Sequence, residues 1–436
     1  MTTQPARGMR DFLPDDVRRR DYVVGVVREV YERYGFEPLE TPAVEDIETL
    51  LGKYGEEGNK LIFKILRRGE HEASGQADLA LRYDLTVPLA RVVAEYQAKL
   101  PRFFKRYQIQ PVWRADRPAR GRFREFYQCD VDIVGSTSMV VEAELCAAVS
   151  DVLTRLGFDD FAIRLNHRQL LIWLLAKAGI AADGQDGALV AIDKLDKAGH
   201  DVVRAELVER GAAGGAADEL LGLLTRRASN EALLDELGEA GGAGELAEIL
   251  RLLEPSGVAR RVRIDPSLAR GLSYYTGAIM EIGVPDLAGS LGGGGRYDRL
   301  IGMFLGREVP ACGFSLGLER ILVVMGERAM FPKSVVRAAS DVMVTLWNED
   351  SRADALALAQ QLRAAGLRVD VYPELDKLAK QFKFASGRQV PFVTVVGDDE
   401  RARNQVTIKD MRVGKQTTVE RNRVAEYLKD RATGDE

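Results

Sequence analysis

The sequence predicts an α+β protein of two or three domains, in which a small α/β domain follows a larger region of mixed strands and helices. Three observations support this expectation. The chain has 436 residues, which is more than one domain usually holds. Strand-forming residues nearly vanish from about residue 181 to 255, where Ala, Gly, Leu and acidic residues dominate. After residue 338, short strand and helix patterns alternate.

The first region, residues 1–180, is predicted to contain both helices and strands. A helix is expected over about 15–34, because Pro14 precedes it, apolar residues recur on one face and Gly35 follows it. Further elements are expected as a strand over 79–88, two strands joined by a polar loop within 109–134, and a helix over about 138–156.

Residues 181–255 are predicted to form a small helical insertion, because the segment has helix-forming residues and little strand character. Strand patterns return at 262–264 and 278–282. Residues 256–328 are therefore assigned to the same domain as residues 1–180.

Residues 338–436 are predicted to form an α/β domain with a largely parallel core, after a linker of about 327–339. Strands that alternate with helices at short spacing favour parallel pairing. The expected strands cover 341–347, 367–372 and 391–396, helices 353–365 and 375–386 lie between them, and two more strands and a helix follow.

Composition describes an ordinary globular protein, with 46% hydrophobic residues, 29% charged residues and a net charge of −5. This net charge gives no general attraction to nucleic acid, so contact with RNA requires a local basic surface. Such a surface is expected in the last domain from Lys377, Lys380, Lys383 and Arg388. We expect no DNA partner.

Cysteine, histidine and hydropathy patterns bear on metal sites and location. The three cysteines form no C-x-x-C pair and the three histidines lack ligand spacing, so no protein-bound metal is expected and a reducing compartment fits. The N-terminus has no apolar signal core, and no apolar run approaches the roughly 20 residues of a membrane span. We expect a cytoplasmic protein without a membrane partner.

The stretch from Arg106 to Asp132 is dense in arginine. Four arginines lie within nine residues and are opposed only by Asp116; they are Arg114, Arg117, Arg120 and Arg122. Crowded like charge is unfavourable unless an anion or full solvation compensates it. Because arginine presents planar, bidentate donors to phosphate, the loop predicts a polyphosphate site.

The strand after this loop has two unlike faces, since side chains alternate along a strand. One face carries Arg124, Phe126, Gln128, Asp130 and Asp132, and the other carries Tyr127, Cys129, Val131 and Ile133. A polar and aromatic face backed by an apolar one indicates the wall of a site. The alternative is a solvated sheet face with surface arginines.

Four further segments are candidates for the same site. Asp84 and Thr86 are placed on the strand over 79–88, where a carboxylate and a hydroxyl could bind an ammonium group. The glycine run within 289–298 allows a ligand to approach the backbone closely, although a flexible turn is the alternative. Residues 313–320 are expected to lead from a strand into a helix, with Arg320 at the edge of a cleft. Residues 270–277 bring an arginine and two tyrosines before a strand.

Together these segments resemble the histidyl-tRNA synthetase family of class II aminoacyl-tRNA synthetases over essentially the whole chain. The most specific segments are RGLSYY from Arg270 and GGGRYD from Gly293, which are similar to the two histidine motifs of that family. Four others resemble the N-terminal signature and the three class II motifs; they are residues 7–14, 34–42, 112–126 and 313–320.

The resemblance implies a catalytic domain on an antiparallel class II sheet, a C-terminal anticodon-binding domain and a homodimer. It implies that L-histidine and ATP, accompanied by Mg²⁺, give histidyl-adenylate and pyrophosphate, after which the histidyl group passes to the 3′ end of tRNA(His). No strong base is needed, because a carboxylate attacks the α-phosphate, and the reaction depends on alignment and charge neutralisation.

The resemblance also implies roles for individual residues. Arg114 and Arg270 would act as catalytic residues on either side of the α-phosphate, and Arg114 would also contact the substrate carboxylate. The other expected histidine contacts are Asp84, Thr86, Gln128, Asp132, Tyr274 and Tyr275. The other expected ATP contacts are Asp116, Arg122, Phe126 and Arg320.

Two other functions are kept as alternatives. A regulatory subunit of ATP phosphoribosyltransferase would bind histidine without aminoacylation, but such relatives typically lack the C-terminal domain. A synthetase of the same subclass for glycine, proline or threonine would have a different pocket.

Ser273 stands where many relatives carry an acid. Ala119 lies in the loop that usually meets the tRNA acceptor end, so recognition of the extra 5′ guanosine of tRNA(His) is left open.

Overall fold

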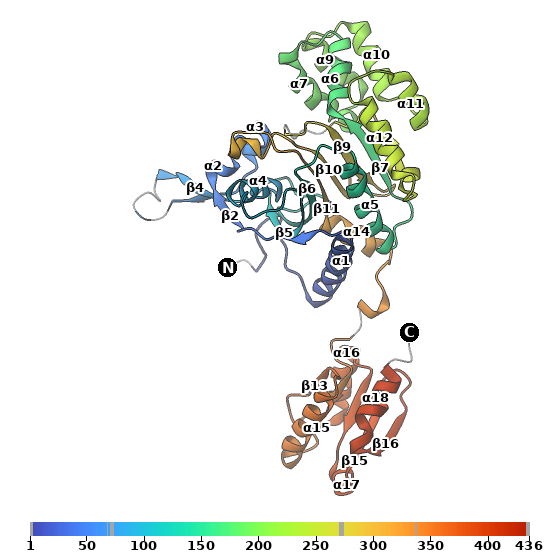
Figure 1. Ribbon diagram of the computed structural model, residues 1–436. Coiled ribbons are helices and arrows are strands. Elements are labelled where there is room, and N and C mark those ends of the chain that lie inside the picture. The colour runs from blue at the N-terminus through green and yellow to red at the C-terminus, as the bar shows by residue number, and fades with distance from the viewer. Residues whose placement is uncertain (1–2, 68, 70–73, 270–273, 336–337, 433–436) are drawn as a thin grey trace. The chain divides into compact units, whose positions relative to one another are not determined.

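The computed structural model describes residues 3–67, 69, 74–269, 274–335 and 338–432. The chain divides into two compact units, Met1–Phe331 and Pro332–Glu436 (Figure 1). Each unit has a sheet of its own, and the larger unit also contains a three-stranded sheet. The predicted fold class, an α+β unit followed by an α/β unit, is confirmed.

The larger unit is built on an eight-stranded sheet with the order β1-β5-β6-β11-β10-β9-β7-β8. The pairs from β5 to β7 are antiparallel, whereas β1 pairs with β5 and β8 pairs with β7 in parallel. The strands are β1 Glu37–Pro38, β5 Phe104–Trp113, β6 Glu125–Val134, β7 Ala162–His167, β8 Val262–Ile264, β9 Ala278–Gly283, β10 Gly292–Arg296 and β11 Ala311–Gly317.

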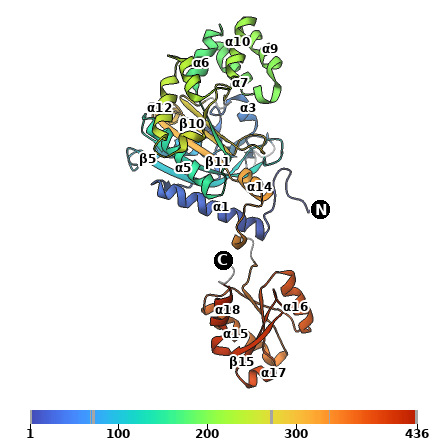
Figure 2. The same ribbon diagram turned by 90° about the vertical axis from the view of Figure 1, so that its right-hand side faces the viewer.

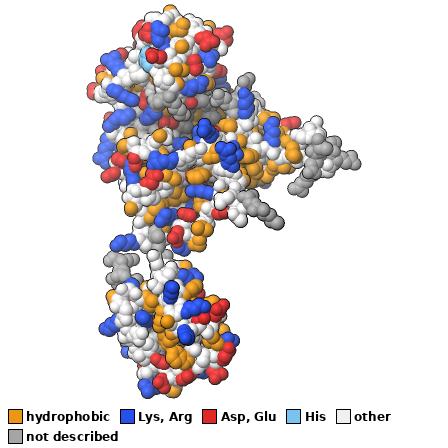
Figure 3. All heavy atoms as spheres, turned by 180° about the vertical axis from the view of Figure 1, so that it is seen from behind, with side chains coloured by type: hydrophobic (Ala, Val, Ile, Leu, Met, Phe, Trp, Pro, Cys, Tyr) orange, Lys and Arg blue, Asp and Glu red, His pale blue; other side chains and the backbone are white. Residues whose placement is uncertain are grey.

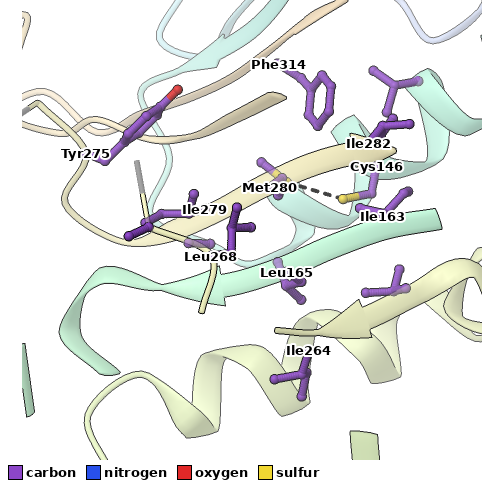
Figure 4. Close-up of a cluster of buried hydrophobic side chains, with 14 of the residues drawn as sticks. Cys146, Ile163, Leu165, Ile264, Leu268, Tyr275, Ile279, Met280, Ile282 and Phe314 are labelled. Atoms are coloured by element: carbon purple, nitrogen blue, oxygen red, sulfur yellow. Dashed lines mark hydrogen bonds between the residues drawn. The ribbon is translucent and has the colours of Figure 1, made fainter. Parts of the chain in front are cut away.

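Three helices cover one face of this sheet: α1 (Pro14–Arg33), α5 (Val140–Arg155) and α14 (Leu318–Glu327). Between α5 and the sheet lies an apolar core, in which the thiol of Cys146 contacts the sulfur of Met280 at 3.3 Å (Figure 4). Because the helices cover this face, the opposite face of the sheet is available for a site.

A smaller three-stranded sheet has the order β2-β4-β3. Its strands are β2 Val44–Asp46, β3 Lys64–Leu66 and β4 Ala77–Leu81, and the helices beside it are α2 Ile47–Leu50, α3 Gly55–Lys60, α4 Thr86–Glu95 and α13 Gly302–Leu305.

The predicted strand over 79–88 is wrong beyond Leu81, because Thr86 begins helix α4. The Asp84 carboxylate accepts a hydrogen bond from the Val87 N–H at 3.0 Å and so satisfies a donor of the first turn. Pro88 is compatible with a helix here, since a proline is tolerated in the first turn.

Helices alone occupy residues 182–253, between β7 and β8. They follow α6 and form a group at one end of the unit (Figures 1 and 2). Their leucine and alanine side chains join the core beneath them. The helices are α6 Arg168–Lys177, α7 Ala182–Ile192, α8 Leu195–Ala198, α9 His200–Glu209, α10 Gly214–Leu224, α11 Asn230–Leu237 and α12 Ala243–Leu253, and the 3-10 turn η2 Val258–Arg261 leads into β8.

The smaller unit has a five-stranded sheet with the order β13-β12-β14-β15-β16. The predicted parallel core is found in β13, β12 and β14, whereas β15 and β16 pair antiparallel. The elements are β12 Val342–Val344, α15 Arg352–Ala364, β13 Val369–Val371, α16 Leu378–Gly387, β14 Phe392–Val395, α17 Asp398–Ala402, β15 Gln405–Asp410, β16 Gln416–Glu420 and α18 Val424–Ala432.

Charges of both signs are interspersed on the face of the molecule seen in Figure 3. This mixture agrees with the small net charge of −5. Of the helices in the described ranges, none combines the length and the apolar character that a membrane crossing requires.

Candidate active site

A cavity of about 1070 Å³ opens on the face of the eight-stranded sheet that the helices leave uncovered. It brings together the predicted site residues that the structure describes, namely Asp84, Thr86, Arg114, Asp116, Arg122, Phe126, Gln128, Asp132, Tyr274, Tyr275 and Arg320. Arg270 and Ser273 lie outside the described residues.

Strand β6 forms one wall of the cavity, as its alternation predicts. Phe126, Gln128 and Asp132 line the cavity, while Cys129 and Val131 point into the core. The prediction that Arg124 belongs to this wall is wrong. Its guanidinium turns away from the cavity and donates hydrogen bonds to the backbone oxygens of Asp116 and Arg7.

Fewer arginines of the loop point into the cavity than the sequence suggests. Arg114 and Arg122 line the cavity, and Arg122 lies 3.8 Å from Asp116. Arg120 borders the cavity, but its guanidinium contacts Glu327 and the backbone oxygen of Asp286. Arg117 is exposed and does not line the cavity. The four arginines therefore divide between ligand-facing and structural positions.

Arg114 is held by one hydrogen bond and two rings. Its Nε donates to the backbone oxygen of Tyr83 at 3.0 Å, and its guanidinium carbon lies 4.3 Å from the Tyr83 ring centroid and 5.2 Å from that of Phe126. Such stacking fixes the plane of a guanidinium.

Arg320 reaches the cavity from the first turn of α14. It donates a hydrogen bond to the backbone oxygen of Ser290. Gly121 and Gly289 have φ angles of +67° and +101° and approach the Arg320 side chain closely. A Cβ on Gly121 would lie 3.1 Å from Arg320 Cγ. Both turns therefore need glycine for their conformation, and Gly121 also needs it for space.

Asp84 is a buried carboxylate at the cavity wall. Its Oδ1 accepts hydrogen bonds from the Tyr54 hydroxyl and the Val87 N–H, both at 3.0 Å. Burial raises the pKa of Asp84, although these two donors and Arg114 oppose the shift. A cation bound beside it would be favoured, because it would stabilise the ionised carboxylate.

A buried charge cluster lies deeper along the same wall. Arg106 is 0% exposed, and its Nη2 lies 2.8 Å from Asp132 Oδ2 and 3.9 Å from Asp130 Oδ2. The Tyr297 hydroxyl donates to Asp132 Oδ1. Burial raises the pKa of both aspartates, that of Asp130 to about 7, while the positive charge of Arg106 opposes the shift.

The sequence analysis placed Asp130 on the site wall without a role of its own, and it gave no role to Arg106 or Tyr297. The sequence does contain a pattern that points to Arg106. Every second residue of this part of β5 is polar and lies on its cavity-side face, namely Arg106, Gln108 and Gln110. Their opposite residues on β6 are Asp132, Asp130 and Gln128. Pairing of these two polar faces would have predicted the cluster.

The glycine run is a strand, which corrects the alternative of a flexible turn, and Gly292, Gly293 and Gly294 line the cavity. Gly292–Arg296 form β10, between β9 and β11. A Cβ on Gly294 would lie 2.0 Å from the Gly313 oxygen, and one on Gly295 would lie 2.9 Å from the Tyr275 ring. The glycines therefore make room for neighbouring backbone and for Tyr275.

Aromatic rings close the end of the cavity near the charge cluster. The ring centroids of Tyr274 and Tyr275 are 5.0 Å apart, and those of Tyr274 and Tyr297 are 6.1 Å apart. Burial raises the pKa of Tyr274 and of Tyr297 well above 10. Both hydroxyls are therefore neutral hydrogen-bonding groups at physiological pH.

The antiparallel sheet, its uncovered face with the cavity, and the separate α/β unit define a class II aminoacyl-tRNA synthetase. The family model for histidyl-tRNA synthetase matches residues 8–321, and a model for an anticodon binding domain matches residues 341–431. The chain belongs to the histidyl-tRNA synthetase family.

Similar proteins agree with this assignment. A histidine–tRNA ligase from Gloeobacter violaceus is 43% identical, covering 94% of this chain and 95% of that protein. One from Porphyromonas gingivalis is 42% identical over the same shares of the two chains. The crystal structure of histidyl-tRNA synthetase from Nostoc sp. PCC 7120 matches with a TM-score of 0.82 and 31% identity, over 99% of this chain and 100% of that one.

One similar structure bears on the sensor alternative. An ATP phosphoribosyltransferase regulatory subunit/histidyl-tRNA synthetase from Bacillus halodurans C has a TM-score of 0.72 and 23% identity, over 90% of this chain and 98% of that one. At this identity the likeness concerns the fold alone. The anticodon-binding match favours the synthetase, because the sensor relatives typically lack that domain.

Proposed function

We propose that this chain activates L-histidine with ATP in the cavity and then transfers the histidyl group to the 3′ end of tRNA(His). The observation that carries the proposal is the position of Arg114. Its stacked guanidinium lies on the same cavity wall as Phe126 and as the buried carboxylate of Asp84. A guanidinium at this position can bind the α-phosphate and the amino-acid carboxylate, the two anions that must be brought together for the reaction.

The ATP end of the cavity is assigned to the arginine loop and α14. Phe126 would stack on adenine, and Arg122 and Arg320 would contact the phosphates as planar donors. Asp116 would accept a hydrogen bond from the nucleotide. The tight turns at Gly121 and Gly289 support the role of Arg320, because they restrict the side chain that would bind the anion.

The histidine end is assigned to the acidic and aromatic wall. Asp84 and Thr86 would bind the α-ammonium group, and Gln128 and Asp132 would contact the rest of the substrate. Tyr274 and Tyr275 would line the imidazole pocket. Neutral imidazole has one donor and one acceptor nitrogen, so an apolar competitor would leave these buried polar groups unpaired.

The first reaction needs alignment more than proton transfer. One oxygen of the histidine carboxylate forms a bond to the α-phosphorus of ATP, and the bond from that phosphorus to the bridging oxygen breaks to release pyrophosphate. Arg114 and Arg270 would stabilise the negative charge on the α-phosphate in the transition state. In the second reaction the terminal ribose hydroxyl of tRNA attacks the histidyl carbonyl, and AMP leaves.

Mg²⁺ is proposed to accompany ATP rather than to occupy a protein-built site. Mg²⁺ that accompanies a nucleotide is held mainly by phosphate oxygens and water, with one or two carboxylates at most. Its chemistry would be to neutralise phosphate charge.

Assembly and location are proposed from the family. Members of class II dimerise through motif 1, which residues 34–42 resemble, so we propose a homodimer. A cytoplasmic location is supported by three cysteines that are all buried, free thiols.

Amino-acid-dependent exchange between ATP and pyrophosphate tests the proposal directly. The intact chain is assayed with Mg²⁺ and each of the twenty amino acids in turn. Exchange with histidine alone is the expected result. Exchange with glycine, proline or threonine would overturn the pocket assignment. Histidine binding without exchange would indicate the sensor function instead.

A further inference from the structure

Asp130 is a buried acid of the cavity wall for which the proposed reaction has no use so far. It is 2% exposed and borders the cavity between Gln128 and Asp132 along β6. Residues two apart on a strand are roughly 6.6 Å apart. A ligand that extends from Phe126 to Asp132 must therefore pass over Asp130.

Asp130 and Asp132 differ in the charge that each one faces. Asp132 Oδ1 accepts a hydrogen bond from Tyr297, and its Oδ2 has no hydrogen bond but lies 2.8 Å from the positive charge of Arg106. Asp130 has a hydrogen bond with Ser315 and lies farther from Arg106, at 3.9 Å. Asp130 Oδ1 has no hydrogen-bond partner among the described residues. A buried carboxylate oxygen without a donor is costly, so it favours a ligand that supplies one.

A second acceptor without a donor lies beside it. Gln128 Nε2 donates to Ser315 Oγ at 2.8 Å, which fixes the orientation of the amide. Gln128 Oε1 is buried and has no donor in the described structure. Ser315 pairs with Asp130 across β6 and β11. Two adjacent acceptors on one wall suit a ligand with N–H groups.

We infer that Asp130 is a further specificity-determining residue, which accepts a hydrogen bond from an N–H group of bound histidine beside Gln128. The inference rests on the proposed function, because it places histidine on this wall. Two groups of histidine can supply the hydrogen, the α-ammonium group or the imidazole ring.

The charge on Asp130 should respond to such a ligand. Burial raises its pKa to about 7, and the charged groups that act on it are Arg106, Asp132 and Asp84. The neighbouring titratable groups that it influences include Cys129 and Tyr274. An N–H donor favours the ionised carboxylate, so histidine binding should lower this pKa and release protons near pH 7.

The test compares wild type with Asp130→Asn, which keeps the size of the side chain and removes the charge. We expect the dissociation constant for histidine to rise about 10- to 100-fold, as for a lost hydrogen bond to a charged group, with the KM for ATP unchanged. Calorimetry in two buffers of different ionisation enthalpy should show proton release by wild type near pH 7 that the variant lacks. Subtracting the variant corrects for the titration of histidine itself.

Imidazole-propionate, which lacks the ammonium group, separates the two sources of the hydrogen. If the ring donates, Asp130→Asn weakens this analogue as much as histidine. If the ammonium group donates, the variant and wild type bind the analogue equally. Both results support the inference.

Other results would overturn it. One such result is that Asp130→Asn binds histidine within about twofold of wild type and releases as many protons. Another is that Asp130→Asn and Asp130→Ala lose affinity for ATP as well as for histidine, which would indicate a structural role for Asp130. Failure of the proposed function is recognised separately, because wild type itself would then show no histidine-dependent exchange.

Discussion

Arg114 has a geometry that lysine cannot reproduce. Its Nε is used by the backbone of Tyr83, and its plane stacks between the rings of Tyr83 and Phe126. Lysine keeps the positive charge but has neither the planar fork nor the stacking. We expect Arg114→Lys to slow pyrophosphate exchange on the order of 100-fold, the scale of losing one transition-state donor. Rapid-quench exchange assays at saturating ATP and histidine measure this rate.

Arg117→Lys is the matched control, because Arg117 belongs to the same loop but is exposed and outside the cavity wall. It should leave the exchange rate unchanged. An Arg114→Lys rate within about threefold of wild type would mean that charge alone is sufficient, contrary to the bidentate role proposed for this arginine.

At single residues, local pattern predicted much of the cavity wall but not its charge cluster. The alternation along β6 is local, so Phe126, Gln128 and Asp132 could be assigned to one face from the sequence. The pairing of Arg106 with Asp132 depends on the β5–β6 register, which the assignment of faces did not use. Tyr297 directly follows β10, a strand that pairs with neither β5 nor β6.

The N-terminal segment, residues 7–12, packs against the arginine loop. The Gly8 oxygen accepts the Arg124 N–H at 2.8 Å. The Arg10 guanidinium lies 4.4 Å and 4.1 Å from the ring centroids of Phe12 and Phe123. Arg10 also lies 3.9 Å from Glu319, which accepts the Tyr127 N–H. The segment therefore connects the arginine loop to the start of α14.

Gly8→Ala should disturb this connection. Gly8 has a φ of +84°, and a Cβ there would lie 2.8 Å from side-chain carbons of Arg124 and Pro118. The strained backbone and the close contact should displace the segment and raise the KM for ATP several-fold, on the scale of a backbone penalty of about 1 kcal/mol. Histidine affinity, measured by calorimetry, should change little.

Gly25→Ala is the control for this element. Gly25 lies within α1, and a Cβ there meets nothing within 4 Å. Alanine should stabilise the helix by about 0.5–1 kcal/mol and leave both substrates unaffected. An unchanged KM for ATP in Gly8→Ala would show that the segment does not position the ATP site.

Two elements show why whole segments can be assigned wrongly from sequence. The pattern over residues 79–88 looks like one strand, but Arg82, Tyr83 and Asp84 interrupt its apolar residues, and the Asp84 carboxylate satisfies the Val87 N–H at the start of α4. The glycines of β10 look like a turn because they lack strand propensity. They form a strand because the neighbouring backbone and Tyr275 exclude a Cβ.

At the scale of the whole molecule, the two units are expected to separate amino-acid activation from anticodon binding. All the described groups assigned to amino-acid activation belong to residues 1–331. The sequence predicted this division because composition and alternation change over long segments. It could not fix the sheet order, which depends on pairings between distant strands.

The smaller unit carries basic and aromatic side chains together on and beside α16. Lys377 and Lys383 are exposed, and Phe384 is 36% exposed. Lys409 lies 4.4 Å from the ring centroid of Phe382, and Arg388 lies 5.4 Å from that of Phe384. Positively charged side chains bind the phosphates of an RNA backbone, and exposed aromatic rings stack on unpaired bases. This surface is therefore suited to single-stranded RNA.

Lys383→Glu should therefore weaken tRNA charging without affecting amino-acid activation. Reversing the charge of one side chain that contacts an RNA phosphate is expected to raise the KM for tRNA about 10-fold at low salt. The effect should become smaller as the salt concentration increases. Lys415→Glu, in the turn between β15 and β16, makes the same charge change on a different element. Aminoacylation and pyrophosphate exchange are measured on the same preparations. A fall in exchange would contradict the separation of amino-acid activation from anticodon binding. An equal effect of Lys415→Glu would contradict the assignment of RNA binding to α16.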